Sequence, residues 1–289
     1  MTARVCQNLT KQRLFEMKRR AFLGTAVFCG LLFAGFAAAQ ENGDYPGTKG
    51  AWNGFDCYDF PFEGRGAKIV VPNKAADGKP WMWRARFFGH EPQTDLALLA
   101  LGYHVAYVDS APLIGSPKSV ELWQKFYVYL TENFGLSKKA NLEGMSRGGL
   151  YVMNWAIAYP DEVASIYIDN PVLDFKSWPG AFGKGGRSDG DWQSVLDSYG
   201  LTEEEAKAYA LNPIDNPALA GLAEKKVPIL AVCGDSDHTV PFEENAKILQ
   251  ERYVKLGGPF ELILKPGNDH HPHSLKDPKP IVDFVLKAN

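Results

Sequence analysis

The sequence predicts an α/β fold in which a mostly parallel central sheet carries helices on both faces, with a small helical lid inserted between two of the strands. Short apolar runs such as residues 229–233 predict strands that are buried on both faces, which is typical of parallel sheets. Helical patterns separate these runs, as the crossover connections of parallel strands require. With 45% hydrophobic residues, the chain of 289 residues has enough apolar side chains for a substantial core.

Residues 1–39 are predicted to be a secretory signal peptide. A basic triplet at residues 18–20 precedes an apolar stretch over residues 21–38, which an Ala-Ala-Ala cleavage signature closes. The arginines of the triplet also resemble a twin-arginine signal, so that route and the general secretory route both stay open. Met17 is a candidate start, because residues 1–16 are polar and atypical of such signals. The mature protein is therefore expected to be secreted or periplasmic, without a membrane anchor.

The mature chain is predicted to begin with a glycine-rich connection. Residues 40–66 are interpreted as an N-terminal linker and the region of the first strand. Glycines and Pro72 flank a hairpin near residues 67–71, and residues 67–289 are predicted to form one domain. Residues 79–86 predict a further strand of the sheet.

A G-x-S-x-G pentapeptide at residues 144–148 is the most informative motif. A short predicted strand over residues 139–143 precedes it, and a predicted helix over residues 149–159, which stops at Pro160, follows it. Glycines on both sides allow a sharp turn that exposes the serine hydroxyl in a cleft. The free N–H groups at the start of the helix favour developing negative charge. We therefore interpret Ser146 as a nucleophile.

Two later strands each end in a loop that carries ionisable residues. The strand at residues 229–233 leads into Gly-Asp-Ser-Asp-His-Thr-Val-Pro at residues 234–241, and residues 242–256 predict a helix. The strand at residues 260–264 leads into Pro-Gly-Asn-Asp-His-His-Pro-His at residues 266–273. Open α/β sheets place their site residues in loops at the carboxyl ends of strands. These two loops are therefore expected to supply the acid and the base for the serine.

The order serine, aspartate, histidine resembles the α/β-hydrolase superfamily, closest to its secreted serine-esterase and prolyl-oligopeptidase-like branches. The resemblance rests on the three motifs above and covers residues 67–286. It implies an α/β-hydrolase fold and a triad of Ser146, His270 and Asp237. In such a triad the imidazole takes the serine proton and the carboxylate orients the imidazole. Nothing in the resemblance implies a cofactor.

Other residues are alternatives for two of these roles. Asp235 lies closer to the strand end and is either the acid or the cap of the following turn. Asp169 ends a predicted strand, at a position where some α/β-hydrolases place the acid. His271 is the alternative to His270 as the base.

The oxyanion hole needs two N–H donors. One is expected from the backbone of Arg147, the residue after the nucleophile. The other is expected from the loop that ends the strand over residues 79–86, near Arg84 and Ala85. The Arg147 side chain has two open interpretations. It helps to hold the oxyanion, as in the similar motif of glucuronoyl esterases, or it forms an ion pair at the surface.

The histidines raise the question of a metal. His270, His271 and His273 lie within four positions, but neither HExxH nor CxxC accompanies them, so no metal is expected. One of them is interpreted as the base, and the others as lining the cleft or bonding the backbone. His90 and His104 are interpreted as ordinary loop and strand-end histidines.

Charge and cysteine content limit the partners. The formal net charge of −3 gives no reason to expect nucleic acid or an anionic membrane as a partner. Removal of the signal peptide leaves Cys57 and Cys233, and the sequence leaves open whether they pair. The oligomeric state also stays open.

The segment over about residues 174–226 is predicted to form the lid. Residues 191–199 predict a helix, and residues 202–205 form a capping box that starts another. Trp178 and Trp192 either stack on a sugar ring or pack the lid onto the core.

These features predict a secreted serine hydrolase that cleaves carboxylic esters through an acyl-enzyme. The expected substrate is a small-molecule or carbohydrate ester, because export and the aromatic lid favour one. The first alternative is a serine peptidase of the prolyl-oligopeptidase-like type, although the chain leaves no room for that family's propeller domain. The second is a non-catalytic binding protein on a hydrolase scaffold, against which the intact order of the three residues argues.

Overall fold

The computed structural model describes residues 45–289. The predicted signal peptide over residues 1–39 lies outside the described residues, and so do the choice of start and of export route. None of the helices within residues 45–289 combines the length and the apolar composition of a membrane span.

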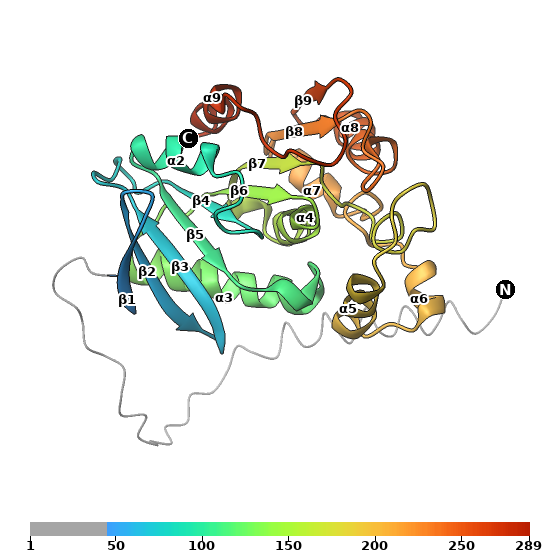
Figure 1. Ribbon diagram of the computed structural model, residues 1–289, viewed down its shortest axis with the longest axis horizontal. Helices are drawn as coiled ribbons and strands as arrows, with labels where there is room; N and C mark the ends of the chain where they lie inside the picture. The colour runs from blue at the N-terminus through green and yellow to red at the C-terminus, as the bar shows by residue number, and fades with distance from the viewer. Residues whose placement is uncertain (1–44) are drawn as a thin grey trace, which may run out of the picture. The chain divides into compact units, whose positions relative to one another are not determined.

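Nine strands form one sheet in the order β1-β2-β3-β5-β4-β6-β7-β8-β9 (Figure 1). Their bounds are β1 (Thr48–Trp52), β2 (Phe55–Phe62), β3 (Arg65–Val71), β4 (Trp81–Arg84), β5 (His104–Val108), β6 (Ala140–Met145), β7 (Val163–Asp169), β8 (Ile229–Gly234) and β9 (Phe260–Lys265). The first three strands and β5 pair antiparallel, and all pairs from β5 to β9 are parallel. The predicted mostly parallel sheet is therefore confirmed. Its order brings the carboxyl ends of β6, β7, β8 and β9 together at one edge.

The sheet begins earlier in the chain than the sequence predicts. The strand β1 lies inside the predicted linker region over residues 40–66 and pairs with β2. Four of its five residues are exposed, so it lacks the apolar alternation that indicates a strand. The predicted domain start at residue 67 falls inside β3.

Helices cover both faces of the sheet (Figure 1). They are α2 (Gln93–Ala100), α3 (Pro117–Asn133), α4 (Gly148–Ala158), α5 (Asp189–Tyr199), α6 (Glu203–Lys207), α7 (Leu219–Glu224), α8 (Ala246–Lys255) and α9 (Lys279–Lys287), with short 3-10 turns η1 (Ala111–Leu113), η2 (Pro160–Glu162) and η3 (Phe242–Glu244). The helices α3, α4, α7 and α8 share one apolar core with Trp81 and Trp83, whereas α2 and α9 pack with Met82 in the other. Alternate side chains of β4 thus serve opposite faces, as the pleat of a strand requires.

The segment between β7 and β8 contains the predicted lid, which is called the cap from here on. The helices α5 and α6 share a separate apolar cluster with Phe175, to which Trp192 contributes. The capping box predicted at Thr202 is present. The helix α7 instead packs in the main core through Leu219, so only the part of residues 174–226 before α7 forms a cap.

The single helix predicted over residues 242–256 is interrupted at Asn245. Its φ of −126° and ψ of −92° separate η3 from α8. The Asn245 Oδ1 atom accepts hydrogen bonds from the backbone N–H groups of Leu173 (2.9 Å) and Asp174 (3.3 Å). A contact to a distant segment thus overrides the local helical pattern.

Candidate active site

Ser146 lies on a sharp turn between β6 and α4. Its φ is +49°, in the left-handed region that residues with a side chain rarely adopt. A Cβ atom on Gly144 would lie 2.7 Å from Val152 Cγ2, inside α4. A Cβ atom on Gly149 would lie 2.7 Å from Pro171 Cβ, in the loop after β7. These glycines therefore allow the close packing that holds the serine in its turn.

Three side chains predicted from separate motifs meet at this turn. His270 Nε2 lies 3.0 Å from Ser146 Oγ, and His270 Nδ1 lies 2.7 Å from Asp237 Oδ2. All three residues are buried. An ionised Asp237 only accepts hydrogen bonds, so it holds the imidazole proton on Nδ1 and leaves the Nε2 lone pair facing the serine hydroxyl.

Backbone groups hold the acid and the base in place. Asp237 Oδ1 accepts hydrogen bonds from the N–H groups of Thr239 (2.9 Å) and Val240 (2.7 Å). Asn170 donates from Nδ2 to the His270 carbonyl at 2.8 Å, and its Oδ1 accepts from the N–H of Gly234 at 2.7 Å. Asn170 therefore ties together the ends of β7, β8 and β9. This role of Asn170 was not predicted, although an asparagine directly after a buried strand is a signal for it.

The alternative acid residues have other partners. Asp235 Oδ1 accepts from the Gly267 N–H at 2.7 Å, so this carboxylate caps a turn. Asp169 is fully buried and bonds a different histidine, with His273 Nδ1 at 2.8 Å. The Tyr167 hydroxyl and the Ser274 N–H donate to its second oxygen, each at 2.8 Å.

The alternative base, His271, has an exposed side chain at the rim of the site. Desolvation, together with the neighbouring His273, His270 and His90, lowers the pKa of His271. Asp269, predicted as a turn residue, accepts from the N–H groups of His270 (2.7 Å) and His238 (2.9 Å).

The Ala85 N–H is not available as an oxyanion donor, which corrects the prediction. It donates to the Glu143 carbonyl at 2.9 Å and so extends the pairing of β4 with β6. The next two N–H groups in the chain, of Arg86 and Phe87, have no acceptor within residues 45–289, and neither has the Arg147 N–H. The candidates for the second oxyanion donor are therefore the N–H groups one and two residues beyond Ala85.

The loop after β4 is held by a buried arginine. Arg84 Nη1 bonds Asp95 Oδ2 at 2.5 Å and Glu143 Oε1 at 3.0 Å. The same guanidinium donates to the carbonyls of Phe87 (3.2 Å, from Nε) and His90 (from Nη2). The Arg84 guanidinium, paired with Asp95 and Glu143, thus orients the carbonyl groups of this loop. Because the peptide groups are planar, it also orients the N–H groups of the following residues.

The Arg147 side chain forms an ion pair, as one of its two interpretations predicts. Its Nη1 bonds Asp191 Oδ1 of α5. Its guanidinium carbon lies 5.3 Å from the ring centre of Phe87 and 5.7 Å from that of Trp178. Arg147 therefore connects the nucleophile turn to the cap, between two aromatic faces.

A cleft of about 420 Å³ opens onto Ser146. Aromatic rings, four histidines and one arginine dominate its lining, which consists of Phe87, Phe88, His90, Ser146, Arg147, Trp178, Thr239, His270, His271 and His273. His90 lies in the loop after β4, as interpreted, and it also lines the cleft, which the sequence did not indicate. Trp178 lines the cleft, whereas Trp192 is buried in the cap cluster and donates to Glu203.

The two cysteines of the described chain, Cys57 and Cys233, are buried and free. Burial raises the pKa of both thiols, so neither has the character of an activated nucleophile.

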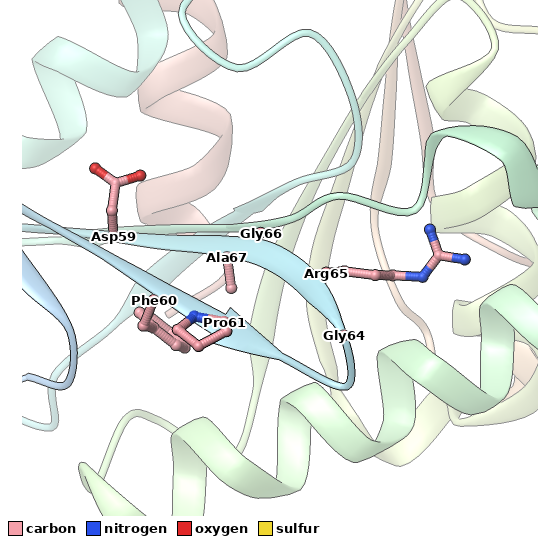
Figure 2. A pocket seen from close by; sticks show the side chains of 7 residues that line it. All are labelled: Asp59, Phe60, Pro61, Gly64, Arg65, Gly66 and Ala67. Atoms are coloured by element: carbon pink, nitrogen blue, oxygen red, sulfur yellow. The ribbon is translucent and has the colours of Figure 1, made fainter.

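A second hollow, of about 520 Å³, lies at the hairpin between β2 and β3 (Figure 2). Its charged side chains, Asp59 and Arg65, point away from each other in Figure 2. Asp59 pairs with Lys68, and Arg65 donates to the Asp109 carbonyl at 3.4 Å. Because no reactive groups converge there, the cleft at Ser146 is the candidate active site.

Comparison with solved structures finds hydrolases of two kinds. The fold is similar to Est1E from Butyrivibrio proteoclasticus (17% identity, TM-score 0.53), with 80% of this chain and 98% of that chain covered. It is similar to a truncated carbohydrate esterase from gut microbiota (16% identity, TM-score 0.58), with 77% and 90% covered. It is also similar to a puromycin-hydrolyzing peptidase from Mycobacterium tuberculosis (14% identity, TM-score 0.57), with 76% and 36% covered. This chain thus spans about a third of the length of that peptidase.

Sequence comparison identifies the family. No curated protein sequence matches this chain. The sequence profile of the prolyl oligopeptidase family matches residues 124–288, which is more than half of the chain and includes all three motifs. The chain therefore belongs to the prolyl oligopeptidase family, and it is a serine hydrolase with the α/β-hydrolase fold.

Proposed function

We propose that this protein is an exported carboxylic-ester hydrolase in which Ser146 is the nucleophile, His270 the general base and acid, and Asp237 the residue that orients His270. The observation that carries the proposal is the continuous hydrogen-bonded relay from Asp237 through His270 to Ser146. The relay lies at the bottom of a cleft large enough for a small substrate.

The proposed reaction has two halves. Ser146 Oγ attacks the ester carbonyl carbon while His270 Nε2 takes its proton, and the charge that forms on the carbonyl oxygen accepts hydrogen bonds from backbone N–H groups. The donors are the N–H of Arg147 and one of the free N–H groups of Arg86 and Phe87. His270 then gives its proton to the leaving alcohol, and the acyl-enzyme forms. Water, deprotonated by His270, attacks the acyl carbon. The bond from that carbon to Ser146 Oγ then breaks, His270 gives the proton to Ser146 Oγ, and the acid is released.

The lining of the cleft favours an ester over an aminopeptidase substrate. Within the described residues it contains neither aspartate nor glutamate, and its one permanently charged side chain, Arg147, is paired with Asp191. A free substrate ammonium bound there would lose its hydration without a carboxylate to replace it. The matches to two esterase structures cover 98% and 90% of those chains, whereas the match to the longer peptidase covers 36% of it, which supports the same choice.

Aromatic surface favours a carbohydrate ester. Trp178, Phe87 and Phe88 line the cleft, and flat apolar rings pack well against the C–H faces of sugars. One similar structure is named a carbohydrate esterase, which agrees with this choice. Export rests on the basic and apolar pattern of residues 18–38.

A peptidase is the second candidate, because the matched family is named for peptidases. One experiment separates the candidates. The mature protein is treated with a fluorophosphonate probe, the adduct is located by peptide mapping, and acetylated sugars, glucuronoyl esters, aryl esters and prolyl peptides are tested as substrates. We expect labelling at Ser146, none in Ser146→Ala, and ester cleavage well above amide cleavage. Amide cleavage equal to ester cleavage would favour the peptidase, and absent labelling would favour a binding protein.

A further inference from the structure

Four imidazoles gather in the cleft, more than the triad uses. The ring centres of His270, His271 and His273 lie 4.8 to 5.0 Å from one another, and His90 lies 6.0 Å from His273. One nitrogen from each of His270, His271 and His273 lies within 4.8 Å of the others. The residues follow one another closely in the loop after β9, so one backbone segment delivers all three rings.

Two of these rings have the support that metal-binding histidines have. A histidine that ligates a metal donates its other ring N–H to a carboxylate or carbonyl, which fixes the tautomer. His273 Nδ1 lies 2.8 Å from the fully buried Asp169, and His270 Nδ1 lies 2.7 Å from Asp237. In both cases Nδ1 carries the proton, and the lone pair on Nε2 is left for a second partner.

For His270 that second partner is the Ser146 hydroxyl, at 3.0 Å. His273 Nε2 has no hydrogen-bond partner within residues 45–289, although the ring lines the cleft. The mechanism proposed above leaves the Asp169–His273 pair without a task. A buried carboxylate that orients an unused imidazole toward a cleft indicates a ligand for that imidazole.

We propose that His270, His271 and His273 form a three-histidine site for a divalent transition-metal ion of the zinc type, and that the bound ion switches the hydrolase off. The inhibitory part of this proposal rests on the proposed function, whereas the binding part does not. Imidazole nitrogen suits Zn²⁺, Cu²⁺ and Ni²⁺. Mg²⁺ and Ca²⁺ prefer oxygen ligands, and the cleft lining described above has no carboxylate to offer them.

The inhibition follows from a single lone pair. The general base needs the Nε2 lone pair of His270 to take the proton of Ser146. A metal ion on the same nitrogen occupies that lone pair and breaks the 3.0 Å contact to Ser146 Oγ. The fourth position of the ion remains for water, as in other three-ligand zinc sites.

Small movements complete the proposed site. Two nitrogens on one tetrahedral zinc ion lie about 3.3 Å apart, given Zn–N distances of about 2.0 Å. The nitrogens here lie within 4.8 Å, so the rings must converge by about 1.5 Å at most. The exposed ring of His271 is free to supply most of this movement.

The test measures binding and inhibition separately. The mature protein is titrated with ZnCl₂ against a chromogenic chelator, and with CoCl₂ while the visible absorption of tetrahedral Co²⁺ is followed. We expect one ion per protein in the wild type and in Ser146→Ala, and at least about tenfold weaker binding in His271→Ala and in His273→Ala. The matched control is His238→Ala, which removes a histidine that is 84% exposed outside the cleft and should bind like the wild type.

Zn²⁺ should also abolish turnover at the stoichiometry of binding, and EDTA should restore it, while MgCl₂ has no effect. Unchanged binding in both His271→Ala and His273→Ala, or equal loss in His238→Ala, would overturn the site. Stoichiometric binding with full turnover would overturn the inhibition alone. Binding by Ser146→Ala is independent of catalysis, so failure of the esterase proposal would leave this result intact.

Discussion

His270 and His273 each bond a buried carboxylate, but only His270 also reaches Ser146. At the scale of single residues, the pairing of each carboxylate with its imidazole therefore determines which histidine can act as the base for Ser146. Asp237 keeps its place through two backbone N–H groups, and Asp169 through a tyrosine hydroxyl and one N–H. Exchange of partners between the two pairs would require the loop after β9 to refold.

Replacement of Asp237 by asparagine should lower kcat by about 10³- to 10⁴-fold, because the amide no longer holds the imidazole tautomer that leaves Nε2 free. Asp169→Asn is the matched change and should lower kcat by less than about tenfold, since His273 takes no part in the proposed proton transfer. Steady-state kinetics of both variants, with circular dichroism to check folding, tests this ranking. The reverse ranking would make Asp169 the catalytic acid.

Gly149→Ala should destabilise the protein by about 1–3 kcal/mol and disturb the nucleophile turn. The new Cβ would lie 2.7 Å from Pro171 Cβ and from the Val172 carbonyl oxygen, and backbone cannot move aside cheaply. The neighbouring Gly148→Ala is the control, because its Cβ would meet Ala85 Cβ at 3.4 Å, an ordinary contact. Urea unfolding measures the stability of both variants. Equal stability of the two variants would contradict the packing described for this turn.

At the scale of elements, two polar contacts fasten the cap to the sheet. Asn245 links the segment after β7 to the start of α8, and the Arg147–Asp191 pair links the nucleophile turn to α5. Asn245 is almost fully buried, whereas both members of the ion pair are partly exposed. Because water screens the exposed pair, the asparagine is expected to contribute more to stability.

Asn245→Ala should therefore lower the free energy of unfolding by about 1–3 kcal/mol, since it leaves buried backbone N–H groups without acceptors. It should also speed proteolytic cleavage within residues 174–188, where the cap begins. Asn216→Ala removes an exposed bond of similar length to the Ala218 N–H and is the control, with an expected loss below about 1 kcal/mol. Denaturant unfolding measures the stability of both variants, and limited proteolysis measures their rates of cleavage. Identical behaviour of the two variants would contradict a fastening role for Asn245.

At the scale of the whole molecule, the sheet is stabilised by apolar cores on both faces. Both described cysteines are free thiols, so burial, hydrogen bonding and pairing of strands supply the stability of residues 45–289. Buried ionisable groups make this stability depend on pH. His104, at the start of β5, is buried, with its ring centre 5.8 Å from that of Tyr45. Desolvation lowers the pKa of His104 to about 4.

Burial of His104 makes the free energy of unfolding fall as the pH is lowered, because the unfolded chain binds the proton more tightly. The unfolded chain binds this proton below its ordinary pKa of about 6.5, whereas the folded protein binds it only below about 4. Stability is therefore full above pH 6.5 and falls as the pH drops toward 4, by about 2 kcal/mol between pH 7 and pH 5. In His104→Gln this part of the loss should disappear. Chemical unfolding at both pH values measures it, with the exposed His238→Gln as control, and an unchanged loss in His104→Gln would contradict the assignment.

Elements with a strong local pattern were predictable. The strand–turn–helix around Ser146, the buried strand β8 and the half-exposed strand β9 lie where the apolar runs and glycines indicate. The loops that carry the acid and the base followed from these elements, because open α/β sheets place their site residues at the carboxyl ends of strands. The choice of Asp237 and His270 within those loops followed from the resemblance to the α/β-hydrolases. The exposed β1 and the interrupted helix at Asn245 were not predictable. Their conformations depend on pairing with β2 and on hydrogen bonds to the segment after β7.

The sequence alone determined the fold class, the strained serine turn and the chain order of nucleophile, acid and base. Only the tertiary structure decided that Asp237 bonds His270 while Asp169 bonds His273. It also decided that the Ala85 N–H donates to the Glu143 carbonyl and that His90 lines the cleft. The physical reason is that a local pattern reports burial and backbone preference, which neighbours in the chain set. Hydrogen-bond partners are chosen by distance in space among loops that different strands deliver to the same edge.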